Sequence, residues 1–355
     1  MPAGFSRKDT DIIKGVGLLM IMLHNYFHII PPISGQNEFS FHPDAIYAFL
    51  EFVKRNPADI CRQLFSYLGH YGVSFFIFVS AYGLYTSYKN KPIQYFSFLK
   101  KRVKKLYPTL LVVVVLLFIF ISLYEGSINF AKTKSLLLKL TLLSNFVAGE
   151  ALAVDGPLWF FSVIVQLYAL FPLLKIMVKK YGRNSLLLVA VACIAINISI
   201  NAWLVTYDLS VYFLFIGQLP VFCLGMYWAV KPMRVPLYIL IIAILILILS
   251  NFNNVAWHFS FLSCTFIMLY VFQQIKGRLG ARSTLAKFLA YTGSISLSLF
   301  AIHGMIRFPF ERMAEYYHRP LITSAIAILF LVTAFAASWC MRFLTGWLFS
   351  QKEKV

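Results

Sequence analysis

The sequence predicts an all-α fold, a polytopic transmembrane helical bundle of about ten spans with both termini in the cytoplasm. Hydrophobic residues make up 60% of the 355 residues and charged residues 13%, and apolar runs recur along nearly the whole chain. A helix that crosses about 30 Å of hydrocarbon needs roughly 20 apolar residues. Strands of a membrane barrel would alternate apolar and polar residues, whereas the stretch LYILIIAILILIL is apolar throughout. We therefore predict one integral-membrane domain over residues 1–355.

Ten runs have the composition of membrane-crossing helices, although one of them, 236–250, is short. In chain order they are 12–30, 72–88, 107–124, 157–177, 185–207, 210–229, 236–250, 254–273, 285–307 and 320–348.

The positions of the basic residues orient these spans. The net charge of +19 is concentrated in alternate loops, which are 89–105, 175–183, 231–234 and 276–287. The loops between them are mixed, acidic or neutral, and these are 31–71, 125–156, 208–209, 251–253 and 308–319. This alternation is the positive-inside pattern, which places the basic loops and both termini in the cytoplasm. The surplus charge is thereby explained by topology, and no nucleic-acid partner is expected.

Two of the outward loops are long. Residues 31–71 have apolar positions every three or four residues, which predicts an amphipathic helix at the outer membrane interface. In the second loop, 125–156, Gly156 and Pro157 mark the turn into the following span.

The first span carries polar groups whose exposure to lipid is energetically unfavourable. At about 100° per residue, Asn25 and His28 lie within roughly 40° of the direction of Lys14, and His24 lies about 80° from it. His24 is ten residues beyond Lys14 and so about 15 Å deeper. An ionisable group at that depth is by default a functional hypothesis. Two structural explanations remain open: Lys14 extends its stem to the headgroups, and His24 is satisfied by a neighbouring polar group.

Two later spans carry further polar side chains. His303 lies towards the outer end of its span, and the same run contains Tyr291 and Ser296, although serines also serve close helix packing. The run that begins at residue 157 contributes Trp159, Ser162, Gln166 and Tyr168. An interfacial anchor is an alternative role for Trp159.

A basic segment, FLKKRVKKLYP, precedes the third span. Lys101, Arg102 and Lys105 are spaced to bind a polyanionic ligand, since Arg and Lys suit phosphates by charge and geometry. The alternative is that they act only as a topology signal.

Taken together and in this order, these segments resemble acyltransferase family 3, a family of integral-membrane acyltransferases. Its members typically open with an acid, a basic residue followed by Gly, and an apolar run ending in His, positions that Asp11, Lys14, Gly15 and His24 occupy here. The later motifs are matched by GVSFFIFVSAYGL, which contains Ser80, and by KRVKKLYP, LWFFSVIVQLYALFPLL and GSISLSLFAIH.

Two positions depart from the family pattern. Nine residues separate Lys14 from His24 where ten are usual, and Asn25 stands at the expected place, so either His24 or His28 is the base. The acid often found after the LW element is absent, because Ile164 and Val165 stand there.

The resemblance implies transfer of an acyl group, commonly acetyl, from acyl-CoA to a hydroxyl of a cell-surface polysaccharide or lipid-linked glycan, in the bacterial inner membrane. His24, Lys14 and His303 are then expected to be catalytic, with Lys101, Arg102 and Lys105 binding the donor. Residues expected to line the pocket or hold the acceptor are Asn25, His28, Ser80, Trp159, Ser162, Gln166, Tyr168, Tyr291 and Ser296. We expect no permanently bound cofactor, and the scattered cysteines predict no metal site.

A transporter or flippase for a polar or lipid-linked saccharide is the main alternative. Such proteins usually show repeats with broken helices at the midplane, and we find no such repeat in the sequence. The oligomeric state is not predicted.

Overall fold

The computed structural model describes residues 4–30, 36–127, 129–277, 283–317 and 319–349, and within them it has α-helices and short 3₁₀ turns but no strand. The α-helices are α1 (Arg7–Phe27), α2 (Ala45–Arg55), α3 (Ile60–Leu68), α4 (Gly72–Tyr88), α5 (Tyr95–Glu125), α6 (Phe130–Leu140), α7 (Trp159–Tyr181), α8 (Ser185–Val205), α9 (Phe215–Val230), α10 (Leu237–Leu249), α11 (Asn254–Ile275), α12 (Thr284–Ser294), α13 (Ser296–Tyr317) and α14 (Pro320–Phe349). The 3₁₀ turns are η1 (Pro57–Asp59), η2 (Gly69–Tyr71), η3 (Ser144–Phe146), η4 (Gly156–Leu158) and η5 (Val211–Phe213).

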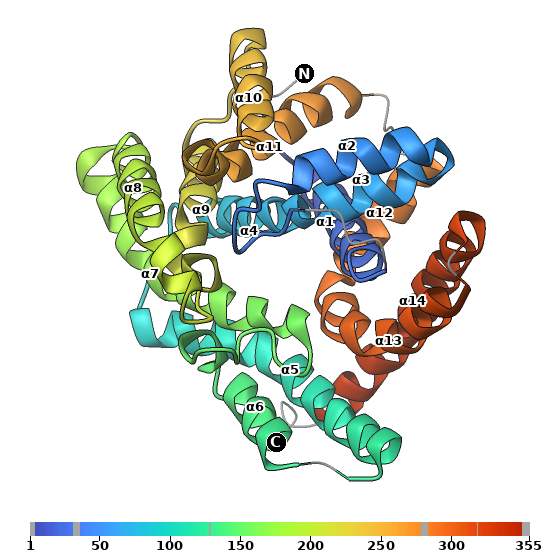
Figure 1. Ribbon diagram of the computed structural model, residues 1–355. Helices are drawn as coiled ribbons and strands as arrows, with labels where there is room; N and C mark the ends of the chain where they lie inside the picture. Colours follow the sequence, from blue (N-terminus) through green and yellow to red (C-terminus); the bar gives the residue numbers. More distant parts are fainter. Residues whose placement is uncertain (1–3, 31–35, 128, 278–282, 318, 350–355) are drawn as a thin grey trace.

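The helices α1 and α4 lie near the middle of the molecule, with the other long helices arranged around them (Figure 1). The helix α1 begins at a capping box, in which Ser6 accepts a hydrogen bond from the Asp9 backbone and Asp9 accepts one from the Ser6 backbone. The capping box thus fixes the residue at which α1 begins.

Six helical segments among the described residues are long and apolar enough to cross a membrane, or seven if the bent pair α12 and α13 counts as one. They are Pro57–Tyr88, Tyr95–Glu125, Gly156–Tyr181, Ser185–Val205, Asn254–Ile275 and Pro320–Phe349. The remaining predicted runs also fold as helices, but α9 and α10 are short and α1 is rich in charge. The protein is thus a multi-pass membrane protein, while the count of ten and the cytoplasmic termini stay predictions.

The outer surface of the bundle is apolar, as lipid requires. In α10 only Ala243 is buried, and α14 exposes Trp339, Phe343 and Trp347. Exposed apolar area on this scale marks contact with lipid or a partner rather than with water.

The predicted run 285–307 is not one straight helix. It breaks at Ile295 into α12 and α13, which meet at 81°. The sequence pattern hides this break because no proline or glycine stands at Ile295. The bend brings the first turn of α13 into the protein interior rather than along a continuous span.

The long loop 31–71 contains two helices rather than the one expected there, α2 and α3, separated by Pro57. The helix α2 buries only Ala45 and Ile46, and α3 buries Arg62, Gln63, Ser66 and Tyr67, so the expected burial of an apolar face stays a prediction. The placement of this loop at the membrane interface stays a prediction as well. Gly156 and Pro157 do mark the entry into α7, as expected.

Glycines let the backbone of α1 approach its neighbours. A Cβ added to Gly293 of α12 would strike the backbone carbonyl of Asp11, and one added to Gly15 would strike that of Leu289. Close approach of small residues is how helices associate where lipid is as apolar as the side chains. This contact holds α1 in the interior.

We predict that Gly293→Ala lowers the free energy of unfolding by about 1–3 kcal/mol, the usual cost of overpacking. Gly83→Ala in α4 is the matched control, because a Cβ there meets no atom within 4 Å. Thermal unfolding of the two variants in detergent measures the difference. Equal melting temperatures would contradict the close contact between α1 and α12.

Candidate functional site

Two cavities lie on either side of a layer of phenylalanines. The first, the histidine cavity, has a volume of about 370 Å³ and lies at the C-terminal end of α1. Among its lining residues are His24, Asn25, His28, Glu38, Phe39, Trp159, Phe300 and Arg307. Its lining residues come from α1, α4, α7, α13, the loop that precedes α2 and the segment that precedes α7.

The hydrogen bonds of His24 fix its tautomer. Its Nδ1 lies 3.0 Å from the carbonyl oxygen of Ser66 and 3.3 Å from that of Phe65. A carbonyl only accepts, so Nδ1 carries the hydrogen and Nε2 keeps a free lone pair. The ring of His28 stacks on His24 with centroids 4.8 Å apart. His24 therefore has the form that a general base requires.

Glu38 lies beside this base, with its Oε2 3.9 Å from His24 Nε2. The residue is 8% exposed, and burial raises the pKa of its carboxyl group to about 7. An acid with a pKa near the working pH is suited to proton transfer or to stabilising an imidazolium. Sequence patterns did not predict this residue, because it lies in a loop outside every motif.

The loop that carries Glu38 is held at both sides. Asn37 Oδ1 accepts hydrogen bonds from the backbone N–H groups of Phe39, at 2.8 Å, and Ser40, at 2.9 Å, which forms a turn around Glu38. The carbonyl of Phe39 in turn accepts from Asn201 and Ser210. These bonds tie the loop to α8 and to the segment before η5.

His303 is fully buried and supports Asn25. Its Nδ1 donates to the carbonyl of Phe300 at 2.6 Å, so Nε2 accepts from the Asn25 amide at 3.0 Å. Both ring nitrogens are thereby occupied, and His303 does not line the cavity. This geometry differs from the expected catalytic role and makes His303 a residue that orients Asn25.

Arg307 was not singled out from the sequence, although it lies one turn beyond His303 on α13. Its guanidinium donates to the carbonyl of Asn25 at 2.9 Å and pairs with Glu311 at 2.5 Å. Its place on the wall of the histidine cavity brings a fixed positive charge to the site.

The second cavity, the basic cavity, has a volume of about 160 Å³. Three cations line it, Lys14, Arg102 and Lys105, together with the predicted residues Ser80, Tyr168 and Ser296. Because Ser296 opens α13, the N-terminal turn of that helix faces the cavity, and such a turn favours anions. The arrangement is that of an anion-binding site.

Aromatic rings position Arg102 in the basic cavity. The guanidinium of Arg102 lies over the rings of Tyr88 and Phe98, each at 5.3 Å, and over the ring of Tyr168 at 5.9 Å. The Nε atom of Arg102 is buried and has no hydrogen-bond partner among the described residues. Lys14, in contrast, is paired with Asp11 at 3.1 Å.

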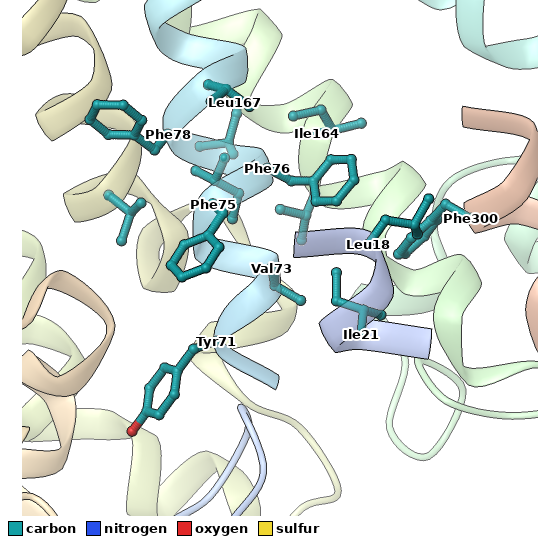
Figure 2. Close-up of a cluster of buried hydrophobic side chains, with 14 of the residues drawn as sticks. Leu18, Ile21, Tyr71, Val73, Phe75, Phe76, Phe78, Ile164, Leu167 and Phe300 are labelled. Carbon is teal, nitrogen blue, oxygen red and sulfur yellow. The ribbon is translucent and has the colours of Figure 1, made fainter. Parts of the chain in front are cut away.

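Three phenylalanines separate the cavities. Phe300 lines both of them, and its ring centroid lies 5.2 Å from Phe160 and 6.3 Å from Phe76. Figure 2 shows Phe76 and Phe300 extending from α4 and α13 towards the part of α1 that carries Leu18 and Ile21. We call these three residues the phenylalanine layer. Lys14 and His24 thus lie in different cavities rather than in one site.

Besides His303, four predicted residues line neither cavity. Ser162 donates to the carbonyl of Leu142, and Gln166 bonds to Ser162 and to the Phe215 backbone, so both are satisfied within the structure. Tyr291 is 49% exposed, and Lys101 is exposed. The assignments of the first three to the pocket and of Lys101 to the donor site find no support in the geometry. The described part of the chain holds no group of three or more side chains arranged for a metal ion.

A family described as an acyltransferase domain, acyltransferase family 3, matches residues 7–343. The chain belongs to acyltransferase family 3. Comparison with curated proteins and with solved structures gave no match. The resemblance inferred from the motifs is confirmed, and the protein is a membrane acyltransferase whose family match covers both cavities.

For this acyltransferase we predict that the rate of transfer rises with pH through about 7 and that Glu38→Gln removes the rise. Below its raised pKa Glu38 is neutral, and above it the carboxylate stabilises a protonated His24. Above pH 8 the Glu38→Gln variant should transfer about 10–100-fold more slowly than the unaltered protein. Turnover is measured against pH.

Glu51→Gln is the control, because Glu51 is exposed on α2 and pairs with Arg55 outside the cavity. Its profile should match that of the unaltered protein. A Glu38→Gln enzyme that keeps the rise near pH 7 would remove Glu38 from the proton transfer.

Proposed function

We propose that this protein is an O-acyltransferase that moves an acyl group, most simply acetyl, from acyl-CoA to a hydroxyl of a cell-surface polysaccharide or lipid-linked glycan. Its proposed place is the bacterial inner membrane, with the donor in the cytoplasm. The observation that carries the proposal is that Phe300 lines both an anion-binding cavity and a cavity with a histidine base.

The basic cavity suits the phosphates of acyl-CoA. Arg102 and Lys105 face it from the start of α5, the helix that follows the basic loop 89–105. The unpartnered Nε–H of Arg102 would donate a charge-assisted hydrogen bond to a phosphate oxygen, and such bonds are about twice as strong as neutral ones. In this proposal Lys14 holds the phosphate or pantetheine part of the donor.

The histidine cavity suits a sugar. Trp159 offers an aromatic face at one wall, where Phe39 packs against it at 5.3 Å. Glu38, Asn25 and His28 offer hydrogen-bonding groups at the others. A mostly apolar wall with a few convergent polar groups is the usual form of a small-molecule site.

The transfer step follows from this placement. His24 Nε2 takes the proton of the acceptor hydroxyl while the oxygen attacks the thioester carbonyl, so the C–O bond forms. The negative charge that develops on the carbonyl oxygen is stabilised by the second N–H of the Asn25 amide and by Arg307. The C–S bond then breaks, and the thiolate of coenzyme A leaves with the proton that His24 returns.

For the reaction to occur, the thioester end of the donor must pass the phenylalanine layer. Lys14 and His24 are ten residues apart on α1, which is about 15 Å. The donor phosphates thus stay in the basic cavity while the acyl group reaches the base. Rotation of Phe300, whose ring lines both cavities, lets the acyl group pass from the basic cavity to the histidine cavity.

Acetyl transfer has a direct test. Surface polysaccharide from cells with and without the gene is compared by mass spectrometry for a labile acetyl ester, and the ester should be lost with the gene. Identical polysaccharide in both strains would contradict a glycan acceptor, and a different ester would replace acetyl with another acyl group.

We predict that Arg102→Gln with Lys105→Gln raises the KM for acyl-CoA by about 10–100-fold, since each lost bond to a charged phosphate costs about 1.5–3 kcal/mol. Lys101→Gln is the matched control, because Lys101 lies outside the cavity in the same basic segment. Its KM should stay within about twofold. Equal KM values for the two variants would show that the segment serves topology alone.

A further inference from the structure

A third cavity adjoins the histidine cavity and has no role in the transfer step. It has a volume of about 150 Å³ and lies between the C-terminal end of α5, the segment before η4, and α13. Its lining residues include the aromatic residues Phe120, Tyr124 and Phe308 and the charged residues Asp155, Arg307 and Glu311. We call it the aromatic cavity. Arg307 and Val154 line both it and the histidine cavity, so the two are neighbours.

One oxygen of the Asp155 carboxylate lacks a hydrogen-bond partner. The residue is 4% exposed, and its Oδ2 is buried with no hydrogen bond to any described residue. Burial raises the pKa of Asp155 to about 6, and the charges of Arg307 and Lys139 oppose that rise, so the group is mainly ionised at neutral pH. A buried charged oxygen without a donor is costly, and a ligand that donates hydrogen bonds would remove this cost.

The backbone holds Asp155 in this position. Val154 has a φ of 66°, a conformation that a β-branched residue rarely adopts and that costs roughly 1–2 kcal/mol. On the opposite side the carboxylate lies against Gly304 of α13, where any side chain would overlap it. The strained residue and the glycine together place Asp155 at the wall of the cavity.

The aromatic rings of the cavity pack against one another. Tyr124 and Phe308 lie edge to face with centroids 5.3 Å apart, and Phe120 stacks on Tyr124 at 5.9 Å. A cavity lined by both aromatic rings and carboxylates is suited to a sugar, whose C–H face packs on a ring while its hydroxyls donate to the carboxylate oxygens.

We propose that the aromatic cavity is a second acceptor subsite, which binds the sugar unit next to the one acylated in the histidine cavity. This inference rests on the proposed transfer to a glycan. It means that the preferred acceptor is an oligosaccharide or polysaccharide chain that passes over Arg307, rather than a free monosaccharide.

The test uses size-fractionated fragments of the surface polysaccharide from cells that lack the gene. Acetyl transfer from acetyl-CoA to the monosaccharide and oligosaccharide fractions is measured with the full-length protein in nanodiscs. In the unaltered protein, kcat/KM for oligosaccharides should exceed the value for the monosaccharide by about tenfold or more. Asp155→Asn and Phe308→Ala should each lower this ratio by about tenfold. Neither variant should change transfer to the monosaccharide by more than about twofold.

Tyr316→Ala is the control for loss of an aromatic ring, because Tyr316 is 79% exposed on the same helix and lies outside the cavity. Equal losses for short and long acceptors in Asp155→Asn and Phe308→Ala would make the cavity structural and overturn the subsite. A loss confined to lipid-linked acceptors would assign it to a lipid tail, which also contradicts the proposal. Absence of transfer to every fraction would instead overturn the glycan acceptor itself.

Discussion

Close packing of α1 against its neighbours is the contact on which the rest of the structure depends. A helix with a lysine and two histidines cannot face lipid without a cost of several kcal/mol, so α1 has to be enclosed by protein. Glycines make this possible, because Gly15 and Gly293 remove the side chains between α1 and α12, and Gly72 of α4 packs on the backbone of Gly17. Enclosed in this way, α1 spans from the basic cavity at Lys14 to the histidine cavity at His24.

The phenylalanine layer divides what the sequence presents as one polar stripe. The charges of the two cavities differ. The basic cavity, which contains Lys14, is lined by cations and by no carboxylate, whereas the histidine cavity is lined by both Glu38 and Arg307. This division suits a reaction whose donor is a polyanion and whose acceptor is a neutral hydroxyl compound. For the proposed acyl-CoA donor, the apolar rings of the phenylalanine layer would keep the thioester away from water until the acceptor is bound.

Helical periodicity was enough to predict the part of the site that lies on single helices. His24, Asn25 and His28 share the end of α1, and Trp159 follows a recognisable turn, so all four line the expected cavity. Helical periodicity did not predict Glu38 or Arg307. The fold of a loop brings Glu38 to the histidine cavity, and the 81° break before α13 brings Arg307 to it. His303, Ser162 and Gln166 were expected at the site for their polarity alone, but each is satisfied by nearby backbone or amide groups. Polarity in a membrane helix predicts that a partner exists, and only the tertiary structure shows whether that partner is protein or substrate.

The central claim is that donor and acceptor enter from opposite sides of the phenylalanine layer. Proteoliposomes with purified surface polysaccharide sealed inside, given acetyl-CoA outside, test it most directly, with His24→Ala protein as the inactive control. We expect acetylated polysaccharide to form when the two substrates are on opposite sides of the membrane, and none when both are supplied on the same side. Transfer that requires both substrates on one side would contradict the account.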